Sequence, residues 1–273
     1  MVKPSQLVSV LIPVYKEVLS EMELKSLHQC ISILSGYPLT LVCPRTLNIK
    51  FYLTEYKDFK IEVFDDLFFS DLQTYNKLLI SYNFYSRFRY YKYILIYHLD
   101  AWVFKDDLKN WCEKDYDYIG APWFKGWHKA EYDSEFIGIG NGGFSLRKVK
   151  SHMKYTSHPF LWIRRNELYN GLHKGGYRDL VKVIPRMAMR FFKNNLLVVK
   201  HSFEFNEDGY WTRVVGANFI DFKIPDYETA AHFSFEYNCE RLFEVTGHTL
   251  PFGCHKWEYN LHFWHRYILT EPA

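Results

Sequence analysis

Residues 93–104 (YILIYHLDAWVF) constrain the fold of this chain more than any other stretch. A run of β-branched, aromatic and aliphatic residues, too short for a helix, is closed by one carboxylate, Asp100. Such a run is typical of a strand that is buried on both faces of a sheet. Asp100 is then expected at the carboxyl end of the strand, where open α/β sheets bind ligands, because a buried, unpaired carboxylate is costly elsewhere. The alternative is that Asp100 only caps the following turn.

Strand and helix patterns alternate in the first half of the chain. Apolar runs predict strands over residues 8–15, 39–44 and 61–64, and prolines end the first two because proline cannot donate to a central ladder. Between those two strands, Ser20 and Glu23 form a capping box ahead of apolar residues at helical spacing. This β-α-β alternation predicts a parallel sheet flanked by helices.

A second capping pair, Ser70 with Gln73, predicts a helix that carries Lys77 and leads into the central strand. Lys77 is either a solvated helix residue or a cation that reaches the phosphates of a ligand. After the central strand, we expect a short helix over residues 107–113 and a strand over residues 116–119.

Glycines, aromatic residues and acids gather after these elements. The loop of residues 124–139 is rich in Gly, Trp, His and acids, so we expect it to be mobile and near a site. The pattern of residues 140–147 then predicts a glycine turn followed by a strand in which apolar and polar residues alternate. Paired glycines let a backbone approach a ligand closely, or they form an ordinary turn. Asn206 is expected to cap a helix whose first turn holds Glu207 and Asp208.

Three later segments have weaker patterns. Residues 185–197 are a candidate basic amphipathic helix that lies on anionic lipid, although a solvated face of the same domain is the simpler interpretation. Residues 230–235 are predicted to form a strand, and residues 251–257 a turn that contains His255.

Composition excludes several classes of protein. The 273 residues, 48% of them hydrophobic, suit one large domain or two small ones. The net charge of +3 comes from interspersed charges, which argues against nucleic-acid binding but leaves anionic phosphates and lipid headgroups as partners. The five cysteines form no CxxC pair and are expected to be reduced core thiols of a cytosolic protein. We recognise no signal peptide, and no apolar run approaches the roughly 20 residues of a membrane span.

Five segments taken together resemble a known family. They are similar to a bacterial family of uncharacterised GT-A-fold glycosyltransferases and, more distantly, to the fringe and β-1,3-galactosyltransferase group. The segments are residues 98–104, 117–123, 140–147, 206–208 and 252–256. The resemblance implies one α/β domain over residues 1–273, GT-A-like (Rossmann-like), with a mostly parallel central sheet flanked by helices. Residues 1–120 would be the nucleotide-binding half, and residues 121–273 the acceptor-binding half.

The same resemblance implies roles for individual residues. In the wider group, an Asp-x-Asp at the end of a central strand binds the ribose and the divalent metal of a nucleotide-sugar. Here Asp100 matches the second acid, the metal ligand, while His98 replaces the first acid. A late histidine of the group, another metal ligand, falls on His255. The acids of a late helix fall on Glu207 and Asp208, and Asp208 corresponds to the base of the inverting relatives, with Glu207 as the fallback.

The chemistry of sugar transfer agrees with these roles. A divalent ion held by few protein ligands neutralises the leaving diphosphate, and a mixed carboxylate and imidazole set suits Mn²⁺ somewhat better than Mg²⁺. The acceptor hydroxyl needs a carboxylate within about 3 Å. Trp123 and Trp127 are candidates to stack on the sugar rings of the acceptor. The candidate donor-binding residues are Pro13, Tyr15, Lys77, His98, Asp100, Asn141, Gly142 and Gly143.

The leading hypothesis is a metal-dependent, inverting glycosyltransferase of the hexosyltransferase type. It would move a sugar from a nucleotide-sugar, with UDP favoured, to a glycan or glycolipid in bacterial surface-polysaccharide assembly. We expect it in the cytoplasm, and peripheral contact with the inner membrane surface is compatible with this. Two alternatives stay open. A sugar nucleotidyltransferase also uses a parallel sheet and a metal, but the usual glycine- and basic-rich loop is not seen after the first strand. A non-catalytic sugar-binding module is suggested by the missing first acid.

Overall fold

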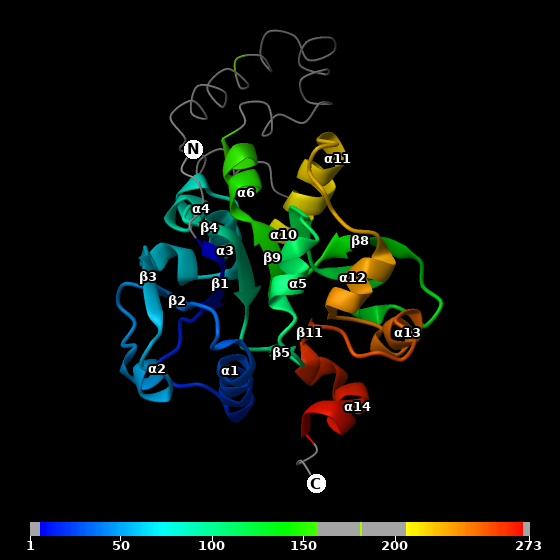
Figure 1. Cartoon of the computed structure of the whole chain (residues 1–273), viewed down its shortest axis with the longest axis horizontal. Helices are drawn as coiled ribbons and strands as arrows, with labels where there is room; N and C mark the ends of the chain where they lie inside the picture. The colour runs from blue at the N-terminus through cyan, green and yellow to red at the C-terminus, as the bar shows by residue number, and fades with distance from the viewer. Residues whose placement is uncertain (1–5, 158–180, 182–205, 270–273) are drawn as a thin grey trace.

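A six-stranded sheet of order β3-β2-β1-β4-β9-β6 runs through the chain in a computed structural model, which describes residues 6–157, 181 and 206–269 (Figure 1). β1, β2, β3, β4 and β6 run in one direction, and β9 alone is antiparallel to its neighbours. The expected mostly parallel central sheet is therefore confirmed. Its strands are β1 (Gln6–Pro13), β2 (Leu39–Pro44), β3 (Lys60–Phe64), β4 (Tyr91–Tyr97), β6 (Tyr118–Ile119) and β9 (Phe144–Lys148).

Two smaller sheets complete the β structure. One has the order β10-β11-β5, formed by β10 (Ser234–Phe235), β11 (Gly253–His255) and β5 (Ala101–Val103). The other is a hairpin of β7 (Ala121–Phe124) and β8 (Phe136–Gly140). The first is important for the site because β5 follows β4 almost directly, whereas β11 lies near the end of the chain. Pairing of β5 with β11 therefore brings the late part of the chain to the carboxyl end of the central strand.

Helices cover both faces of the large sheet. On one face, α1 and α5 pack on residues such as Leu95. On the other, α3, α4 and α6 pack on Ile94 and Ile96. The central strand is thus buried on both faces, as its apolar run predicts. The helices up to residue 157 are α1 (Glu21–Leu34), α2 (Lys50–Glu55), α3 (Leu72–Leu79), α4 (Tyr82–Arg87), α5 (Leu108–Glu113) and α6 (Val149–Thr156).

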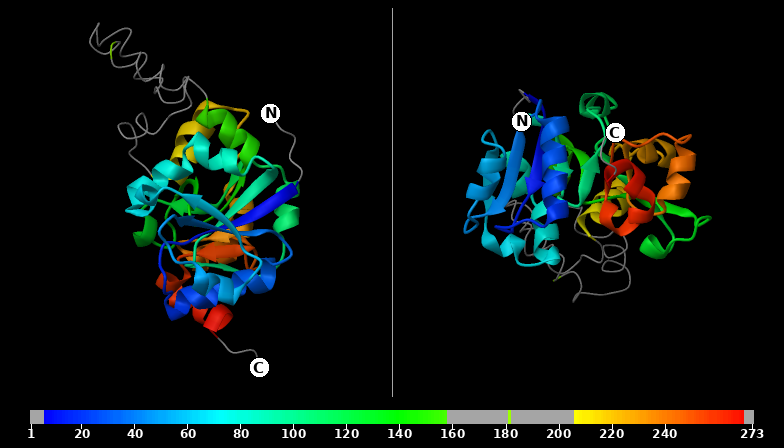
Figure 2. Two further views of the ribbon diagram at one scale, coloured as in Figure 1. Left: turned by 90° about the vertical axis from the view of Figure 1, so that its left-hand side faces the viewer. Right: turned by 90° about the horizontal axis from the view of Figure 1, so that it is seen from below.

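The C-terminal helices lie on the other side of β4 and β9 from the N-terminal strands and helices (Figures 1 and 2). These helices are α10 (Glu207–Gly209), α11 (Gly216–Asn218), α12 (Tyr227–Phe233), α13 (Cys239–Val245) and α14 (Leu261–Trp264). Short 3-10 helices span Asp66–Phe69, Trp127–Lys129 and Trp257–Asn260, and π-helical turns span Tyr210–Val215 and His265–Leu269. The central strand thus forms the boundary at which the two parts of the chain meet.

The first capping prediction is confirmed, and the second is wrong by one residue. Ser20 Oγ accepts from Glu23 N at 3.2 Å, while Ser20 N donates to the Glu23 carboxylate at 2.8 Å. Ahead of α3, however, the cap is Asp71, whose Oδ1 accepts from Thr74 N at 2.7 Å. Ser70 already has helical backbone angles, whereas Asp71 is extended as a cap must be.

Three other segments differ from their sequence patterns. Residues 230–233 belong to α12, which begins after the cap of Asp226, so only Ser234 and Phe235 form a strand. The 251–257 turn contains β11. The 124–139 loop contains a 3-10 helix and β8, whose Phe136 packs on Phe124 with ring centroids 4.7 Å apart. Short apolar runs do not distinguish strand from helix, and these pairings come from distant residues.

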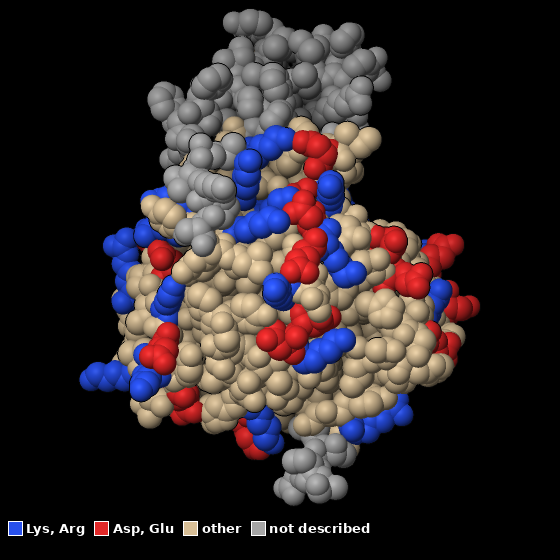
Figure 3. Space-filling model, viewed as in Figure 1, with Lys and Arg blue, Asp and Glu red and all other residues tan. Residues whose placement is uncertain are grey.

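All five cysteines are buried and unpaired, as expected of core thiols. Basic and acidic side chains are interspersed on the face shown in Figure 3. In the described part of the chain, no helix is both long and apolar enough to cross a bilayer. The candidate amphipathic helix over residues 185–197 lies outside the described residues.

Candidate functional site

Three side chains that can bind a metal converge beyond the carboxyl end of β4. His98 and Asp100 lie in the turn between β4 and β5, and His255 is the last residue of β11. Register pairs His255 with Ala101, directly after Asp100. One ligand atom from each of the three residues lies within 4.8 Å of the other two, and His255 Nε2 is 3.1 Å from Asp100 Oδ1. The β5–β11 pairing is thus what assembles the cluster.

The protonation chemistry of the cluster fits a cation. Burial lowers the pKa of His98 to about 4, so its imidazole is neutral, as a metal ligand must be. Burial opposes a charge on His255, but the attraction of Asp100 and hydrogen bonds to both neighbouring carboxylates raise its pKa to about 9. Burial likewise opposes the charge of Asp100, whose pKa is nevertheless held well below its usual range by His255. A cation would take the place of the His255 proton between these groups.

A second carboxylate, Glu236, contacts the far side of the His255 ring. Its Oε1 lies 3.2 Å from His255 Nδ1 and accepts from Lys256 Nζ at 2.8 Å. Glu236 is buried, and burial opposes its charge, but the bonds to His255 and Lys256 lower its pKa to about 2. Sequence reasoning missed this residue, although it directly follows the predicted strand of residues 230–235, as Asp100 follows the central strand.

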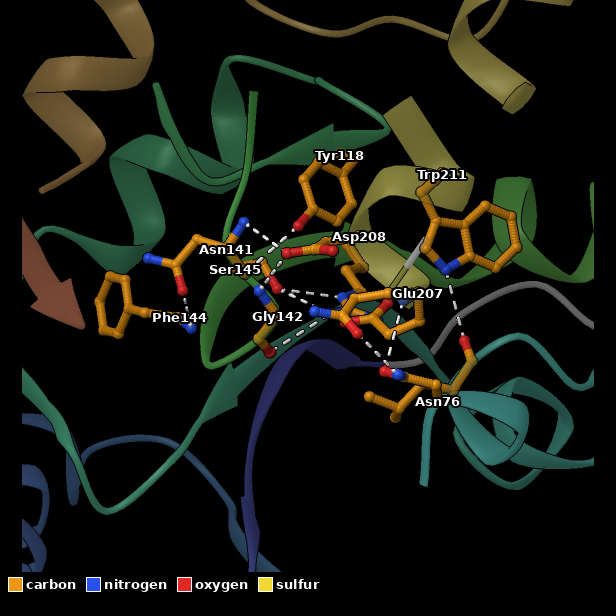
Figure 4. Close-up of polar contacts among 12 residues, drawn as sticks. Asn76, Tyr118, Asn141, Gly142, Phe144, Ser145, Glu207, Asp208 and Trp211 are labelled. Atoms are coloured by element: carbon orange, nitrogen blue, oxygen red, sulfur yellow. Dashed lines mark hydrogen bonds and ion pairs between the residues drawn. The ribbon is translucent and has the colours of Figure 1, made fainter. Parts of the chain in front are cut away.

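An acidic pair, Glu207 and Asp208, lies beside the glycine turn that contains Asn141 and Gly142 (Figure 4). Glu207 and Asp208 begin α10, and both are buried. Asp208 Oδ2 accepts from the backbone N–H groups of Asn141 and Gly142, at 3.0 Å each. Its Oδ1 accepts from Gly209 N at 2.7 Å. The carboxylate of Asp208 is therefore fixed on the turn that connects β8 to β9.

Glu207 forms a buried ion pair. Arg147 of β9 donates from Nη1 and Nη2 to its two carboxylate oxygens, at 2.7 Å each. Burial raises the pKa of Glu207 to about 7, against the attraction of Arg147. Asn206 begins the helix, but its side chain makes no capping bond and instead accepts from Asn76 at 3.1 Å. Asn206 therefore occupies the expected N-cap position with both acids in the first turn, but it makes no side-chain capping bond because its side-chain oxygen is engaged by α3. Arg147 was not singled out, because a lone arginine in a strand looks like a surface residue.

The glycine turn contacts both groups. Gly143 O accepts from His98 N at 2.8 Å. A Cβ atom at Gly143 would lie 2.1 Å from His255 Nε2, and one at Gly142 would lie 2.7 Å from Glu207 Oε1. Asn141 has a φ of 101°, and its side-chain Oδ1 accepts from Phe144 N at 3.0 Å, which closes the turn. Paired glycines are required here because the backbone passes against the site.

A cleft of about 610 Å³ opens beside the metal-ligand cluster. It lies at the carboxyl end of β1, and its lining includes Pro13, Tyr15, His98 and Asp100. The structure thus brings together four of the candidate donor-binding residues in one cleft. Lys77 lies in the last turn of α3 and does not line it.

The two candidate acceptor residues lie elsewhere. Trp123 is buried in β7, and its ring fills the space that a side chain at Gly140 would need. Trp127 is 38% exposed, and its ring centroid lies 4.8 Å from that of Trp123. Arg213 lies over both rings, at 5.4 and 5.5 Å from the centroids. Of the two, only Trp127 presents surface on which a sugar ring can stack.

Comparison with known proteins identifies a family and a partial likeness of fold. The sequence model of the family described as "Protein of unknown function (DUF5672)" matches residues 58–255. No curated protein matches the chain.

Solved structures with a similar fold include three glycosyl-transferring enzymes. The glycosyltransferase GlyE of Streptococcus pneumoniae TIGR4, apo form, is 11% identical, with a TM-score of 0.48 over 98% of this chain and 65% of that chain. Mouse xyloside xylosyltransferase 1 is 10% identical, with a TM-score of 0.49 over 90% of this chain and 96% of that chain. Core-mannan synthase A of Aspergillus fumigatus, in an Mn/GDP form, is 9% identical, with a TM-score of 0.44 over 81% and 72%. This chain spans about two thirds of the length of GlyE. All three scores are below 0.5, so the likeness of fold is partial.

Proposed function

This chain belongs to the family described as "Protein of unknown function (DUF5672)", and from its own site we propose that it is a metal-dependent glycosyltransferase that uses a nucleotide-sugar donor. The observation that carries the proposal is the convergence of His98, Asp100 and His255 beside the cleft. Open α/β sheets bind nucleotides outside the carboxyl ends of their strands, and the cleft lies there. A cation site at this position can hold the diphosphate of a donor.

The three ligands suit a divalent cation, Mn²⁺ or Mg²⁺. Two imidazoles beside one carboxylate favour Mn²⁺, because Mg²⁺ prefers oxygen ligands. A bound ion would neutralise the charge that develops on the leaving diphosphate. The few ligands that the chain supplies leave coordination positions for that diphosphate.

Asp208 is the proposed base for the acceptor hydroxyl. Burial, the largest effect, and the charge of Glu236 raise its pKa, which makes its carboxylate a better proton acceptor. Three backbone N–H groups hold the carboxylate in one orientation. Direct attack of the hydroxyl that Asp208 activates would invert the anomeric carbon. Glu207 stays the second candidate, although Arg147 engages both of its oxygens.

The substrate classes are part of the proposal. The cleft beside Pro13 and Tyr15 would take the nucleotide, with UDP favoured, so residues 1–120 would supply most of the donor half. The glycan or glycolipid acceptor would meet residues 121–273, where Trp127 offers an exposed ring. A role in bacterial surface-polysaccharide assembly, in the cytoplasm or at the inner membrane surface, completes the proposal.

Analysis of the reaction products tests the proposed glycosyltransferase activity. The chain is incubated with a panel of nucleotide-sugars, with Mn²⁺, with Mg²⁺ and with chelator, and nucleoside diphosphate is measured. We expect metal-dependent release of diphosphate, lost in Asp100→Ala and retained in Asp58→Ala, a change at an exposed acid of the turn before β3. Pyrophosphate release from a nucleoside triphosphate and a sugar 1-phosphate would instead identify a nucleotidyltransferase. Donor binding without any turnover, even hydrolysis, would identify a sugar-binding module.

A further inference from the structure

We propose that Glu236 is a positioning residue for the metal site: it fixes the His255 ring and holds the proton on Nδ1, which leaves Nε2 to bind the cation. This inference rests on the proposed function, because it concerns the metal of that site. Glu236 itself is not one of the three clustered ligands.

The sheet places Glu236 beside His255. β10 pairs in parallel with β11, with Phe235 opposite Cys254, and the next position along both strands brings Glu236 to His255. Glu236 Oε1 lies 3.2 Å from His255 Nδ1, while Asp100 Oδ1 lies 3.1 Å from Nε2. The His255 ring is therefore held between two carboxylates. Asp100 belongs to the ligand cluster, whereas Glu236 lies on the opposite side of the ring.

Lys256 helps to keep the Glu236 carboxylate beside the His255 ring. Adjacent residues of a strand point to opposite faces, so Lys256 would normally point away from the partner of His255. Its φ of 53° turns the chain after β11, and its ammonium group donates to the same Glu236 Oε1 at 2.8 Å. Lys256 also donates to Tyr237 OH at 2.7 Å. Asn260 Nδ2 anchors the backbone oxygen of Glu236 at 3.1 Å.

This arrangement determines the tautomer of His255. A carboxylate paired with an ammonium group is ionised and only accepts hydrogen bonds, so the nitrogen that faces it must carry a proton. A neutral imidazole has one N–H, and with that proton on Nδ1 the lone pair of Nε2 is available to the cation. Carboxylates behind metal-binding histidines act in this way, and their loss typically weakens metal binding by about 10- to 100-fold.

The chain contains a matched control. Glu240 in α13 lies 2.9 Å from His262 Nε2, so it is also a carboxylate paired with a histidine. This pair is on the surface, with side chains 48% and 68% exposed, and neither residue is in the ligand cluster. Glu240→Ala therefore removes the same chemical group four positions along the chain without touching the site.

The first measurement is the dissociation constant of Mn²⁺ for the full chain, by titration calorimetry at one pH, with thermal unfolding to verify the fold. We expect Glu236→Ala to weaken binding by about 10- to 100-fold. Glu240→Ala should match the wild type. Glu236→Gln, which keeps the shape and one acceptor oxygen, should give an intermediate value and serves if the alanine variant does not fold. Wild-type affinity in the folded Glu236 variants would overturn the inference.

The second measurement needs no metal. A histidine ring N–H held on a buried carboxylate exchanges slowly and gives a proton resonance far downfield, which NMR of the metal-free chain detects. The signal of interest is that of the Nδ1 proton, which is assigned through its nitrogen and so distinguished from a proton on Nε2 that faces Asp100. We expect the Nδ1 signal to be lost in His255→Ala and Glu236→Ala but retained in Glu240→Ala, and its survival in Glu236→Ala would refute the contact. A wild-type chain that binds no divalent cation would overturn the proposed metal site together with this inference. Normal wild-type binding with unchanged Glu236 variants would overturn the inference alone.

Discussion

The backbone of Gly143 lies against the imidazole of His255 so closely that an added Cβ atom would be 2.1 Å from Nε2. Gly143 O also accepts from the backbone N–H of His98. One residue thus contacts both histidines of the proposed metal site, from the turn that also holds the carboxylate of Asp208. The neighbouring His255 ring, and not the conformation of the turn, thus leaves no space for a side chain at position 143.

Gly143→Ala should therefore impair metal binding without unfolding the chain. A methyl group at this position forces His255 away from Asp100, so we expect the affinity for Mn²⁺ to fall by about tenfold or more, comparable to the loss of a metal-supporting contact. Calorimetry measures this. Gly36→Ala is the control, because nothing lies within 4 Å of a Cβ atom added there. Equal affinities in the two variants would show that His255 does not bind the ion.

Removal of the metal should lower the apparent stability of the chain. A ligand that binds only the folded state stabilises it by about 2.7 kcal/mol at 100 times its dissociation constant. We expect Mn²⁺ to raise the unfolding temperature and chelator to reverse the change. Asp100→Ala and His255→Ala should abolish the shift, whereas Asp58→Ala should keep it. A full shift in both site variants would place the metal elsewhere.

Asp208→Asn should abolish transfer while donor binding stays within a few-fold of the wild type. The amide can still accept from Asn141 N and Gly142 N, but it cannot take the proton of an acceptor, so we expect transfer to fall by about 10²- to 10⁴-fold. Initial rates and donor titrations measure the two effects. Asp226→Asn, which makes the same change at the carboxylate that caps α12, is the control. Full activity in Asp208→Asn would exclude it as the base.

The buried Arg147–Glu207 pair should be important for stability. Removing one partner leaves an uncompensated buried charge, so we expect Arg147→Met to cost about 3–5 kcal/mol of unfolding free energy. The double variant Arg147→Met/Glu207→Leu should be less destabilised than the sum of the two single variants, because no charge stays buried. Urea denaturation measures these values. Arg87→Met, at the partly exposed pair with Glu62, should cost no more than about 1 kcal/mol. Additive losses in the double variant would contradict the coupling.

Local sequence patterns predicted the central sheet because the residues that specify its strands and helix starts lie close together in the sequence. The run before Asp100 and the box of Ser20 with Glu23 contain all that a buried strand or a helix start requires. At residues 70–71 two capping residues are adjacent, and only the backbone angles, which tertiary packing sets, select Asp71. Residues 230–233 were misassigned because a four-residue apolar run fits a strand as well as a helix.

The site depends on pairings between distant segments. Family resemblance supplied Asp100, His255 and Asp208, but no pattern shows that β5 pairs with β11 or that Gly143 lies against an imidazole. The contact of Glu236 with His255 could not be found from sequence, since it depends on the left-handed turn at Lys256 and on the register of β10. Supporting residues of a site lack a local signature because any acid at the right place in space would serve.

His98 brings a second imidazole to the ligand cluster, and this nitrogen ligand should determine which metal binds. Its imidazole is neutral, and Tyr75 OH lies 3.1 Å from its Nε2. His98→Asp would add a negative charge and an oxygen ligand, and Tyr75 OH can donate to the new carboxylate. Because Mg²⁺ prefers oxygen and Mn²⁺ tolerates nitrogen, we expect the preference for Mn²⁺ over Mg²⁺ to fall by about tenfold, or about 1.4 kcal/mol.

Competition calorimetry with the two ions measures this preference. His128→Asp, in the 3-10 helix Trp127–Lys129 and away from the ligand cluster, is the control that separates a change of ligand from a change of net charge. An unchanged preference in His98→Asp would show that His98 does not contact the ion. Asp100 and His255 would then be its remaining ligands from the cluster, and the imidazole of His98 would contact the donor instead.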